Sequence, residues 1–161
     1  MSIRSTLFVL LLPLAGCAGL VDAIDAALPT YAGGEVDAIT LRTLPPSKPG
    51  GGAWDRSGAA DPYVVVRDAD GGVLFRGETV RDAVPSQYPL RWALNGVRAE
   101  MEDVLWVEVL DDDLAEDDVV ARYRVRLSEV GGVVKPDVIP LQGPGGETLA
   151  EMSVRWIEAA G

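Results

Sequence analysis

The sequence predicts an all-β fold, an eight-stranded antiparallel β-sandwich, from the length of its apolar segments and the turn signals between them. The segments are short and rich in β-branched and aromatic residues, which favours strands over helices. They span residues 36–44, 63–67, 73–80, 90–94, 104–110, 119–127, 138–141 and 148–157. Eight strands at this spacing are typical of two packed antiparallel sheets.

Glycine and proline clusters punctuate these segments and predict the turns. They lie at residues 45–46, 49–52, 70–72, 95–96, 131–132 and 143–146. Pro cannot donate to a strand ladder and Gly tolerates the backbone angles of tight turns, so such clusters mark loops. A single helical turn is expected at 128–130, between two strands.

Alternation of apolar and polar residues supports the strand assignments. In residues 123–127, Tyr123, Val125 and Leu127 point one way and the intervening arginines the other. The last segment repeats the pattern, with Thr148, Ala150, Met152, Val154 and Trp156 on one face. We expect Trp92, Trp106 and Trp156 in the core, whereas Trp54 stands in a glycine-rich loop. Arg122, Arg124 and Arg126 form a basic strip, either a solvated strand face or a contact for anionic headgroups.

The N-terminus has the layout of a secretory signal. Arg4 precedes an apolar run at 7–14, and small residues stand in front of Cys17. The word Leu14-Ala15-Gly16-Cys17 resembles the lipobox of bacterial lipoproteins. That resemblance implies cleavage before Cys17 and attachment of a diacylglycerol to its sulfur.

An ordinary signal peptide with a chance cysteine, or a single buried thiol, is the alternative. Cys17 is the only cysteine of the chain and has no disulfide partner, which favours lipidation. Ala18 follows it where, by the same resemblance, an aspartate would favour retention at the inner membrane. The sequence therefore indicates a bacterial cell envelope location, lipid-anchored, at the outer membrane.

Three regions are expected along the chain: a lipoprotein signal peptide at 1–16, a lipidated cysteine and tether at 17–34, and a domain at 35–161. Residues 19–28 allow one short helix, although a tether is the simpler interpretation. Cleavage would remove Arg4 from the 14 Lys and Arg residues and none of the 25 Asp and Glu, which lowers the net charge from −11 to −12. So acidic a chain excludes a nucleic-acid partner.

The acidic residues gather in two groups, at 54–66 and 109–120. Both lie in loops beside strands, and the loops at one end of a sandwich converge. Carboxylates gathered there repel one another, and the oxygen ligands of short Asp side chains favour Ca²⁺. Taken singly, Asp61 is a common turn residue before Pro62, and Asp111 to Asp118 is a charge run of the kind usually found in solvated loops.

The two acidic groups resemble the calcium loops of C2 domains, the calcium- and lipid-binding modules of synaptotagmins and protein kinases C. Asp55, five residues, then Asp61-Pro62-Tyr63-Val64 is similar to the first loop, and Asp111-x-Asp113 followed by Asp117-Asp118 to the third. The resemblance covers residues 35–158. It implies carboxylate ligands at Asp55, Asp61, Asp111 and Asp113, closure by Asp117 or Asp118, and carbonyl ligands at Trp54 and Asp112.

Two departures from the C2 pattern stand out. The third loop is about one residue shorter than the commonest form, which leaves Asp117, Asp118 and Glu116 as alternatives. The second loop lacks the usual Asn-Pro-x-aromatic-Asn word and has 84–92 in its place, beginning Val84-Pro85. A ligand from that loop is therefore in doubt.

The sequence predicts a binding protein rather than an enzyme. It contains no histidine, no phosphate-binding glycine loop and no nucleophile elbow. We expect an envelope lipoprotein whose C2-like domain binds Ca²⁺ and docks onto a membrane or protein, the alternative being a metal-free structural or adaptor sandwich. The expected partners are the membrane, through lipidated Cys17, and a phospholipid or an envelope protein.

Overall fold

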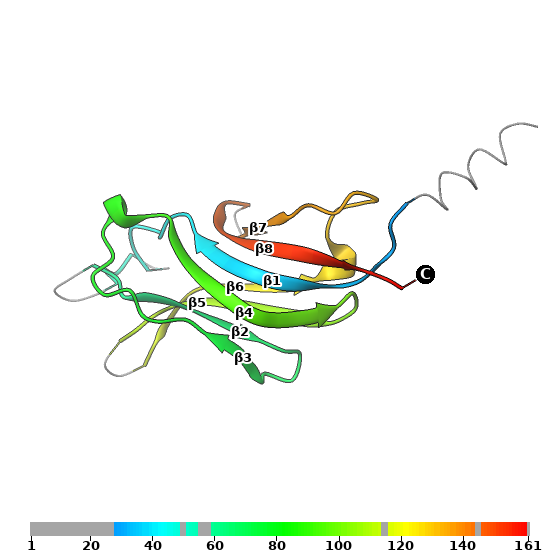
Figure 1. Ribbon diagram of the computed structural model, residues 1–161. Helices are drawn as coiled ribbons and strands as arrows, with labels where there is room; N and C mark the ends of the chain where they lie inside the picture. Colours follow the sequence, from blue (N-terminus) through cyan, green and yellow to red (C-terminus); the bar gives the residue numbers. More distant parts are fainter. Residues whose placement is uncertain (1–27, 49–50, 55–58, 114–115, 144–145, 161) are drawn as a thin grey trace, which may run out of the picture.

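The protein is a sandwich of two four-stranded antiparallel sheets, as the sequence predicts (Figure 1). The computed structural model describes residues 28–48, 51–54, 59–113, 116–143 and 146–160. One sheet has the order β4-β1-β8-β7 and the other the order β3-β2-β5-β6. The eight strands of the two sheets are β1 (Tyr31–Leu41), β2 (Pro62–Arg67), β3 (Val73–Arg76), β4 (Leu90–Glu100), β5 (Val104–Asp111), β6 (Asp118–Arg126), β7 (Val138–Gln142) and β8 (Thr148–Glu158). Single 3₁₀ turns occupy Pro85–Gln87 (η1) and Leu127–Glu129 (η2), the second confirming the helical turn expected beside residue 128.

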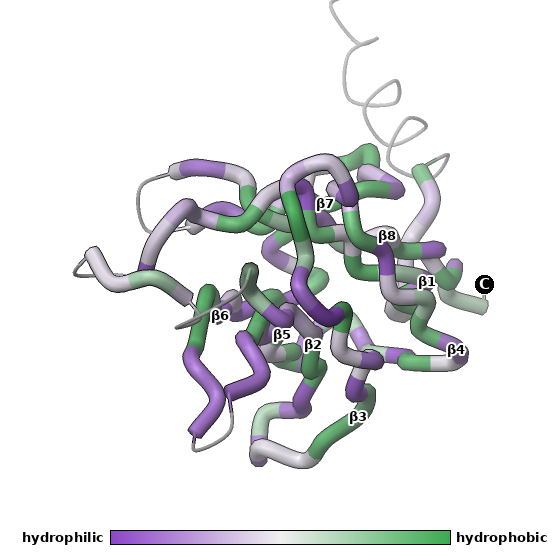
Figure 2. Tube along the Cα trace, turned by 90° about the vertical axis from the view of Figure 1, so that its left-hand side faces the viewer, coloured by the Kyte–Doolittle hydropathy of each residue, from purple (hydrophilic) through white to green (hydrophobic). Residues whose placement is uncertain are grey.

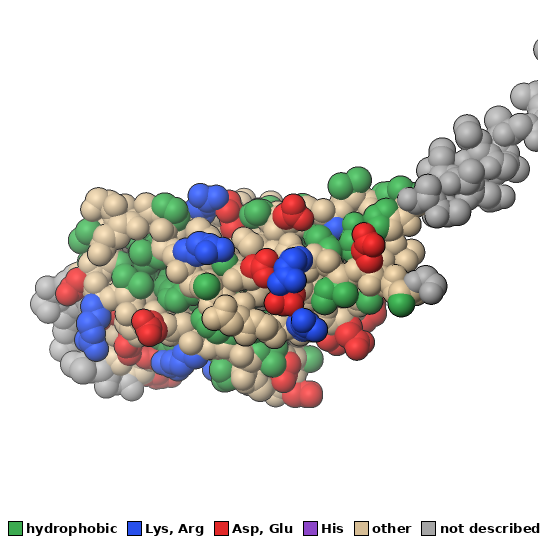
Figure 3. Space-filling view, viewed as in Figure 1, with side chains coloured by type: hydrophobic (Ala, Val, Ile, Leu, Met, Phe, Trp, Pro, Cys, Tyr) green, Lys and Arg blue, Asp and Glu red, His purple; other side chains and the backbone are tan. Residues whose placement is uncertain are grey.

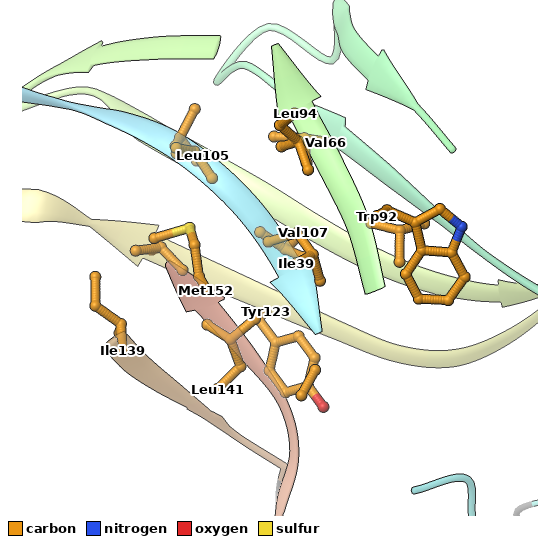
Figure 4. Close-up of a cluster of buried hydrophobic side chains, with 14 of the residues drawn as sticks. Ile39, Val66, Trp92, Leu94, Leu105, Val107, Tyr123, Ile139, Leu141 and Met152 are labelled. Atoms are coloured by element: carbon orange, nitrogen blue, oxygen red, sulfur yellow. The ribbon is translucent and has the colours of Figure 1, made fainter. Parts of the chain in front are cut away.

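The core lies between the sheets and is built from the inward positions of both. Ile39 and Met152 from one sheet face Val107 and Tyr123 from the other, all of them buried (Figure 4). The predicted alternation of Tyr123, Val125 and Leu127 toward the core is confirmed. Within the described residues, no helix has the length and apolarity needed to cross a membrane.

The first strand, β1, begins at Tyr31. It therefore starts before the domain boundary expected at Glu35 and includes the last residues of the tether expected over 17–34. Gly33 and Gly34 look like linker residues because glycine weakens strands. Here they allow close approach of the chain: a Cβ on Gly33 would lie 2.2 Å from the carbonyl oxygen of Ala99, and one on Gly34 would lie 2.6 Å from Cγ1 of Val154.

The turn expected at Asn95-Gly96 is a bulge inside β4. Val36 pairs with Val97 whereas Ala38 pairs with Ala93, so β4 carries extra residues opposite Asp37. Gly96 has a φ of 87°, which glycine adopts without strain. The bulge lets β4 continue to Glu100, well past the predicted end at residue 94.

Trp106 is not a core residue. Leu105, Val107 and Val109 take the inward positions of β5, which leaves Trp106 half-buried on the outer face beside Glu108. Trp92 is buried as expected, and its indole nitrogen donates to the carbonyl of Glu78. Trp156 is only half-buried, at the rim of the core.

The arginine strip of β6 is held by carboxylates. Arg122 lies 2.7 Å from Glu108, a buried residue that Arg67 also contacts at 3.0 Å. Arg124 lies 3.2 Å from Glu129. These pairs neutralise much of the strip, in line with its interpretation as a solvated strand face.

The position of β1 generates a first prediction, about the domain boundary. A fragment of residues 28–161 should melt higher than a fragment of residues 35–161. The shorter one lacks the ring contact between Tyr31 and Trp156 at 5.7 Å and the pairing of Gly33 and Gly34 with β4 and β8. An aromatic pair and a few ladder hydrogen bonds, each about 1 kcal/mol, make a deficit of roughly 2–4 kcal/mol in the free energy of unfolding. Equal denaturant midpoints for the two fragments would contradict this.

Candidate metal centre at the acidic end

Three strand ends bring the acidic groups together at one end of the sandwich, here called the acidic end. In the ladder of the second sheet, Pro62 pairs with Asp111, and Asp111 pairs with Asp118. The β1–β2, β3–β4 and β5–β6 connections therefore emerge side by side (Figure 1). Figure 2 looks onto this end and shows hydrophilic stretches where β5 and β6 turn into each other. The convergence expected from the sequence is thus present for the residues that the structure describes.

Asp61 and Asp111 join the first and third connections through backbone hydrogen bonds. The N–H of Asp61 donates to Oδ1 of Asp111 at 2.6 Å, and the N–H of Asp112 donates to the carbonyl of Asp61 at 3.1 Å. Asp111 is fully buried. Oδ1 of Asp61 accepts the N–H of Asp82, at 2.6 Å, from the β3–β4 connection. The carboxylates of Asp61 and Asp111 therefore link all three connections to one another.

Lys48 brings a positive charge into the acidic end. Its ammonium group donates to Asp118 and also lies 3.4 Å from Oδ2 of Asp113. The hydrogen bond to Asp118 raises the pKa of Lys48, and the same bond lowers the pKa of Asp118. The residue comes from the β1–β2 connection, so the charge bridges the first and third connections.

Trp54 packs beneath this lysine. Its ring is buried, its indole N–H donates to the carbonyl of Pro45 at 2.7 Å, and the Lys48 ammonium lies 5.9 Å from the ring centroid. The side chain is therefore part of the loop's own packing and braces Lys48.

Asp117 and Asp112 have partners of their own. Asp117 accepts the hydroxyl of Tyr63 and lies 3.9 Å from Arg76, whose guanidinium stacks 4.3 Å from the Tyr63 ring centroid. Burial, followed by the hydrogen bond to Asp117, raises the pKa of Tyr63 to about 12. Oδ2 of Asp112 accepts the hydroxyl of Thr79 at 3.0 Å.

These residues supply the donor chemistry of a calcium site, since hard carboxylate oxygens from short side chains are what Ca²⁺ prefers. Among the described residues, however, no three carboxylates are grouped as a metal site. Asp61, Asp112, Asp113, Asp117 and Asp118 are each engaged by a protein donor, and Asp55 lies outside the described residues. The calcium ligand set stays a prediction.

No protein-family model and no curated protein matches the chain. Solved structures do. A human GIVD cytosolic phospholipase A2 matches over 80% of this chain and 16% of its own, with 21% identity and a TM-score of 0.47. A C2 domain of a plant extended synaptotagmin 1 matches over 83% and 97% of the two chains, with 14% identity and a TM-score of 0.42.

A C2 domain protein from Ramazzottius varieornatus matches over 82% and 93%, with 15% identity and a TM-score of 0.41. The strand order itself shows an all-β sandwich of two four-stranded antiparallel sheets, the fold class that the sequence predicts. At these identities the likeness concerns the fold alone.

Sequence reasoning missed the protein donors that the sandwich brings to its acidic carboxylates, namely Lys48, Tyr63, Arg76, Thr79 and the backbone of Asp82. Each contacts a carboxylate far away in sequence, such as Asp118 for Lys48, so no local spacing indicates the pair. The one available signal was a lysine inside the Pro/Gly-rich loop that enters the acidic end. Cys17, the predicted lipidation site, lies outside the described residues.

The Lys48 bridge generates a second prediction. Lys48→Gln should lower the melting temperature modestly at neutral pH and leave the fold intact. The lowered pKa of Asp118 means that the bridge stabilises above the ordinary aspartate value of 3.8 and is lost as pH falls through the lowered pKa. The raised pKa of Lys48 means that the stabilisation by the bridge is fully present below pH 10.5, the ordinary lysine value, and is lost as pH rises through the raised pKa.

Melting curves of both proteins across this range measure the difference, which should be flat between the two limits and shrink in acid. The matched control is Arg98→Gln, which removes an exposed ion pair to Glu35 at 3.1 Å on the other sheet. If the melting temperature of the wild type exceeds that of Lys48→Gln by the same amount well below pH 3.8, Lys48 acts through packing rather than charge.

Proposed function

We propose that the protein is a lipid-anchored binding module of a bacterial envelope, whose C2-like domain takes up Ca²⁺ at the acidic end and there docks a phospholipid headgroup or an envelope protein. The observation that supports this most is the convergence of six aspartates on one end of the sandwich. They are Asp61, Asp111, Asp112, Asp113, Asp117 and Asp118.

Uptake of Ca²⁺ at this end requires an exchange of cations. The Lys48 ammonium already compensates Asp113 and Asp118. A divalent ion that binds these two carboxylates has to displace it, and the lysine then moves toward solvent. Exchange of this kind favours weak binding, in the range of about 10⁻⁴ to 10⁻³ M that is usual for extracellular calcium modules.

The third prediction is a calcium-dependent gain in stability. At a tenfold excess over the dissociation constant, the native state gains RT ln 11, about 1.4 kcal/mol. For a domain of this size, that corresponds to a rise in melting temperature of roughly 3–8 °C. Mg²⁺ should do much less, because it demands a tighter octahedral shell. Scanning calorimetry with millimolar CaCl₂ or MgCl₂ measures both.

The control for this experiment is the double variant Asp111→Asn, Asp113→Asn. Asparagine keeps an oxygen that can accept the N–H of Asp61, so the fold should survive while the calcium response disappears. Absence of any calcium-dependent shift in the wild type would end the metal proposal.

The Lys48 bridge also favours a second candidate, a metal-free adaptor in which the lysine permanently takes the place of the cation. The two candidates differ in what Lys48→Gln does. Under the calcium proposal it removes the competitor and enlarges the calcium response. Under the metal-free one it only destabilises the domain, and neither protein responds to calcium. Arg98→Gln should leave the calcium response unchanged in both cases, because its ion pair to Glu35 is remote from the acidic end.

The fourth prediction concerns the anchor, and it rests on the word Leu14-Ala15-Gly16-Cys17 in a chain with one cysteine. Cys17→Ala should abolish membrane association in cell fractionation and leave the signal uncut or mis-cut. The purified mature wild type should carry an acylated N-terminal cysteine in its mass spectrum. Observation of an unmodified thiol at Cys17 would refute the anchor.

A further inference from the structure

The end of the sandwich opposite the acidic loops exposes apolar side chains. This anchor end consists of the β6–β7 connection (residues 127–137), the start of β1 and the end of β8. Val133 and Val134 on the connection are 58% and 82% exposed, and Val138 at the start of β7 is 47% exposed. Val134 is the most exposed large hydrophobic residue in the described part of the chain. In Figure 3, hydrophobic side chains lie at the right-hand end of the domain, where the described chain begins, interspersed with acidic ones.

The backbone of this connection is fixed by several hydrogen bonds. The Lys135 ammonium donates to the carbonyl of Val130 at 2.7 Å and to that of Leu127 at 3.4 Å. The indole N–H of Trp156 donates to the carbonyl of Pro136 at 3.0 Å, and the N–H of Val154 donates to that of Asp137 at 2.8 Å. The valines are therefore held in solvent on a braced loop, at a continuing hydrophobic cost.

The residues beside the valines are those of a membrane interface. Tyr31 and Trp156 form a ring pair at 5.7 Å, and the Lys135 ammonium lies 5.5 Å from the Trp156 ring centroid. With Val138 they line one shallow groove. Tyr, Trp and Lys each combine an apolar body with a polar tip and are favoured at the level of lipid headgroups.

The chain enters the domain at this same end. The N–H of Ala159 donates to the carbonyl of Thr30, so β1 starts next to the end of β8. Between Cys17 and Thr30 there are 12 residues, which reach at most about 45 Å when fully extended. A chain held by acyl groups on Cys17 thus keeps the anchor end within that distance of the bilayer.

We infer that the anchor end rests on the membrane that holds the chain, with Val133 and Val134 inserted at headgroup level. This inference depends on the proposed lipidation of Cys17. It places the acidic end on the far side of the domain, facing the aqueous compartment. Some charges near the contact are paired, since Arg126 lies 3.3 Å from Glu129 and Arg155 lies 2.9 Å from Glu35. Asp137 and Glu158 line the same groove as Trp156 and add negative charge beside it.

The test uses the full, lipidated chain with Val134→Cys, labelled with an environment-sensitive fluorophore. Acylation blocks the Cys17 sulfur, so the introduced thiol alone takes the label. The matched control is Val119→Cys, an exposed valine, 46% accessible, at the acidic end. Both are reconstituted at low density into phosphatidylethanolamine/phosphatidylglycerol vesicles that contain nitroxide lipids. We expect several-fold stronger quenching and a blue-shifted emission at position 134, since interfacial side chains lie about 5–10 Å into the headgroup boundary.

The outcomes separate this inference from the proposed anchor. If the mass spectrum shows no acyl group, the anchor fails and the inference fails with it. If the protein is acylated and sediments with vesicles, but position 134 is quenched no more than position 119, only the inference fails. A blue shift without nitroxide quenching also overturns it. Such a shift assigns the valines to a second copy when it grows with the protein-to-lipid ratio, and to residues 18–27 of the same chain when it does not.

Discussion

The arrangement of the acidic end depends on one buried carboxylate, that of Asp111. It sits at the last position of β5, fully buried, and accepts the backbone N–H of Asp61 at 2.6 Å. A buried charge is costly without hydrogen bonds, so its presence constrains where the β1–β2 connection can return to the sheet. Asp61 in turn accepts the N–H of Asp82 and so fixes the β3–β4 connection. These hydrogen bonds fix where the three connections meet at the acidic end.

Because three connections are tied together in this way, the remaining aspartates have little freedom to spread apart. Their mutual repulsion is relieved by donors that the fold brings from elsewhere, a lysine, an arginine, a tyrosine and a threonine. The protein's own donors thus offset part of the carboxylate repulsion that a bound cation would otherwise offset. Lys48 is the central residue in this respect, since its ammonium contacts two carboxylates and lies above a buried indole.

The sequence predicted the features that depend on neighbouring residues, namely the strand faces and the loops. Alternation in residues such as Tyr123, Val125 and Leu127 revealed the inward face of a strand, and paired glycines and prolines marked most of the loops. The errors arose where a residue type was used against its usual tendency. Gly33 and Gly34 occupy strand positions where neighbouring atoms leave no room for a Cβ. Gly96 belongs to a bulge rather than a turn.

For the candidate site, the sequence located the carboxylates of Asp111 and Asp61 but could not locate their donors, because hydrogen bonds between residues distant in sequence leave no trace in spacing. Trp106 shows the same limit, since the register of β5, and not its hydropathy, decides which face it occupies.

The two ends of the sandwich differ in chemistry, and this difference connects the fold to the proposed function. At one end, hydrogen bonds of Asp61 and Asp111 tie three loops together, and the other end presents exposed valines near Tyr31 and Trp156, where the described chain enters the domain. If the proposed lipid anchor holds the module at the second end, calcium is not needed for its recruitment to a membrane. Cation exchange at Lys48 would instead change the charge and shape of the surface that faces the aqueous compartment, because the lysine leaves Asp113 and Asp118 as the ion arrives. Under this proposal, calcium would regulate which partner binds the acidic end, and the lipid together with the opposite end would determine where the protein stays.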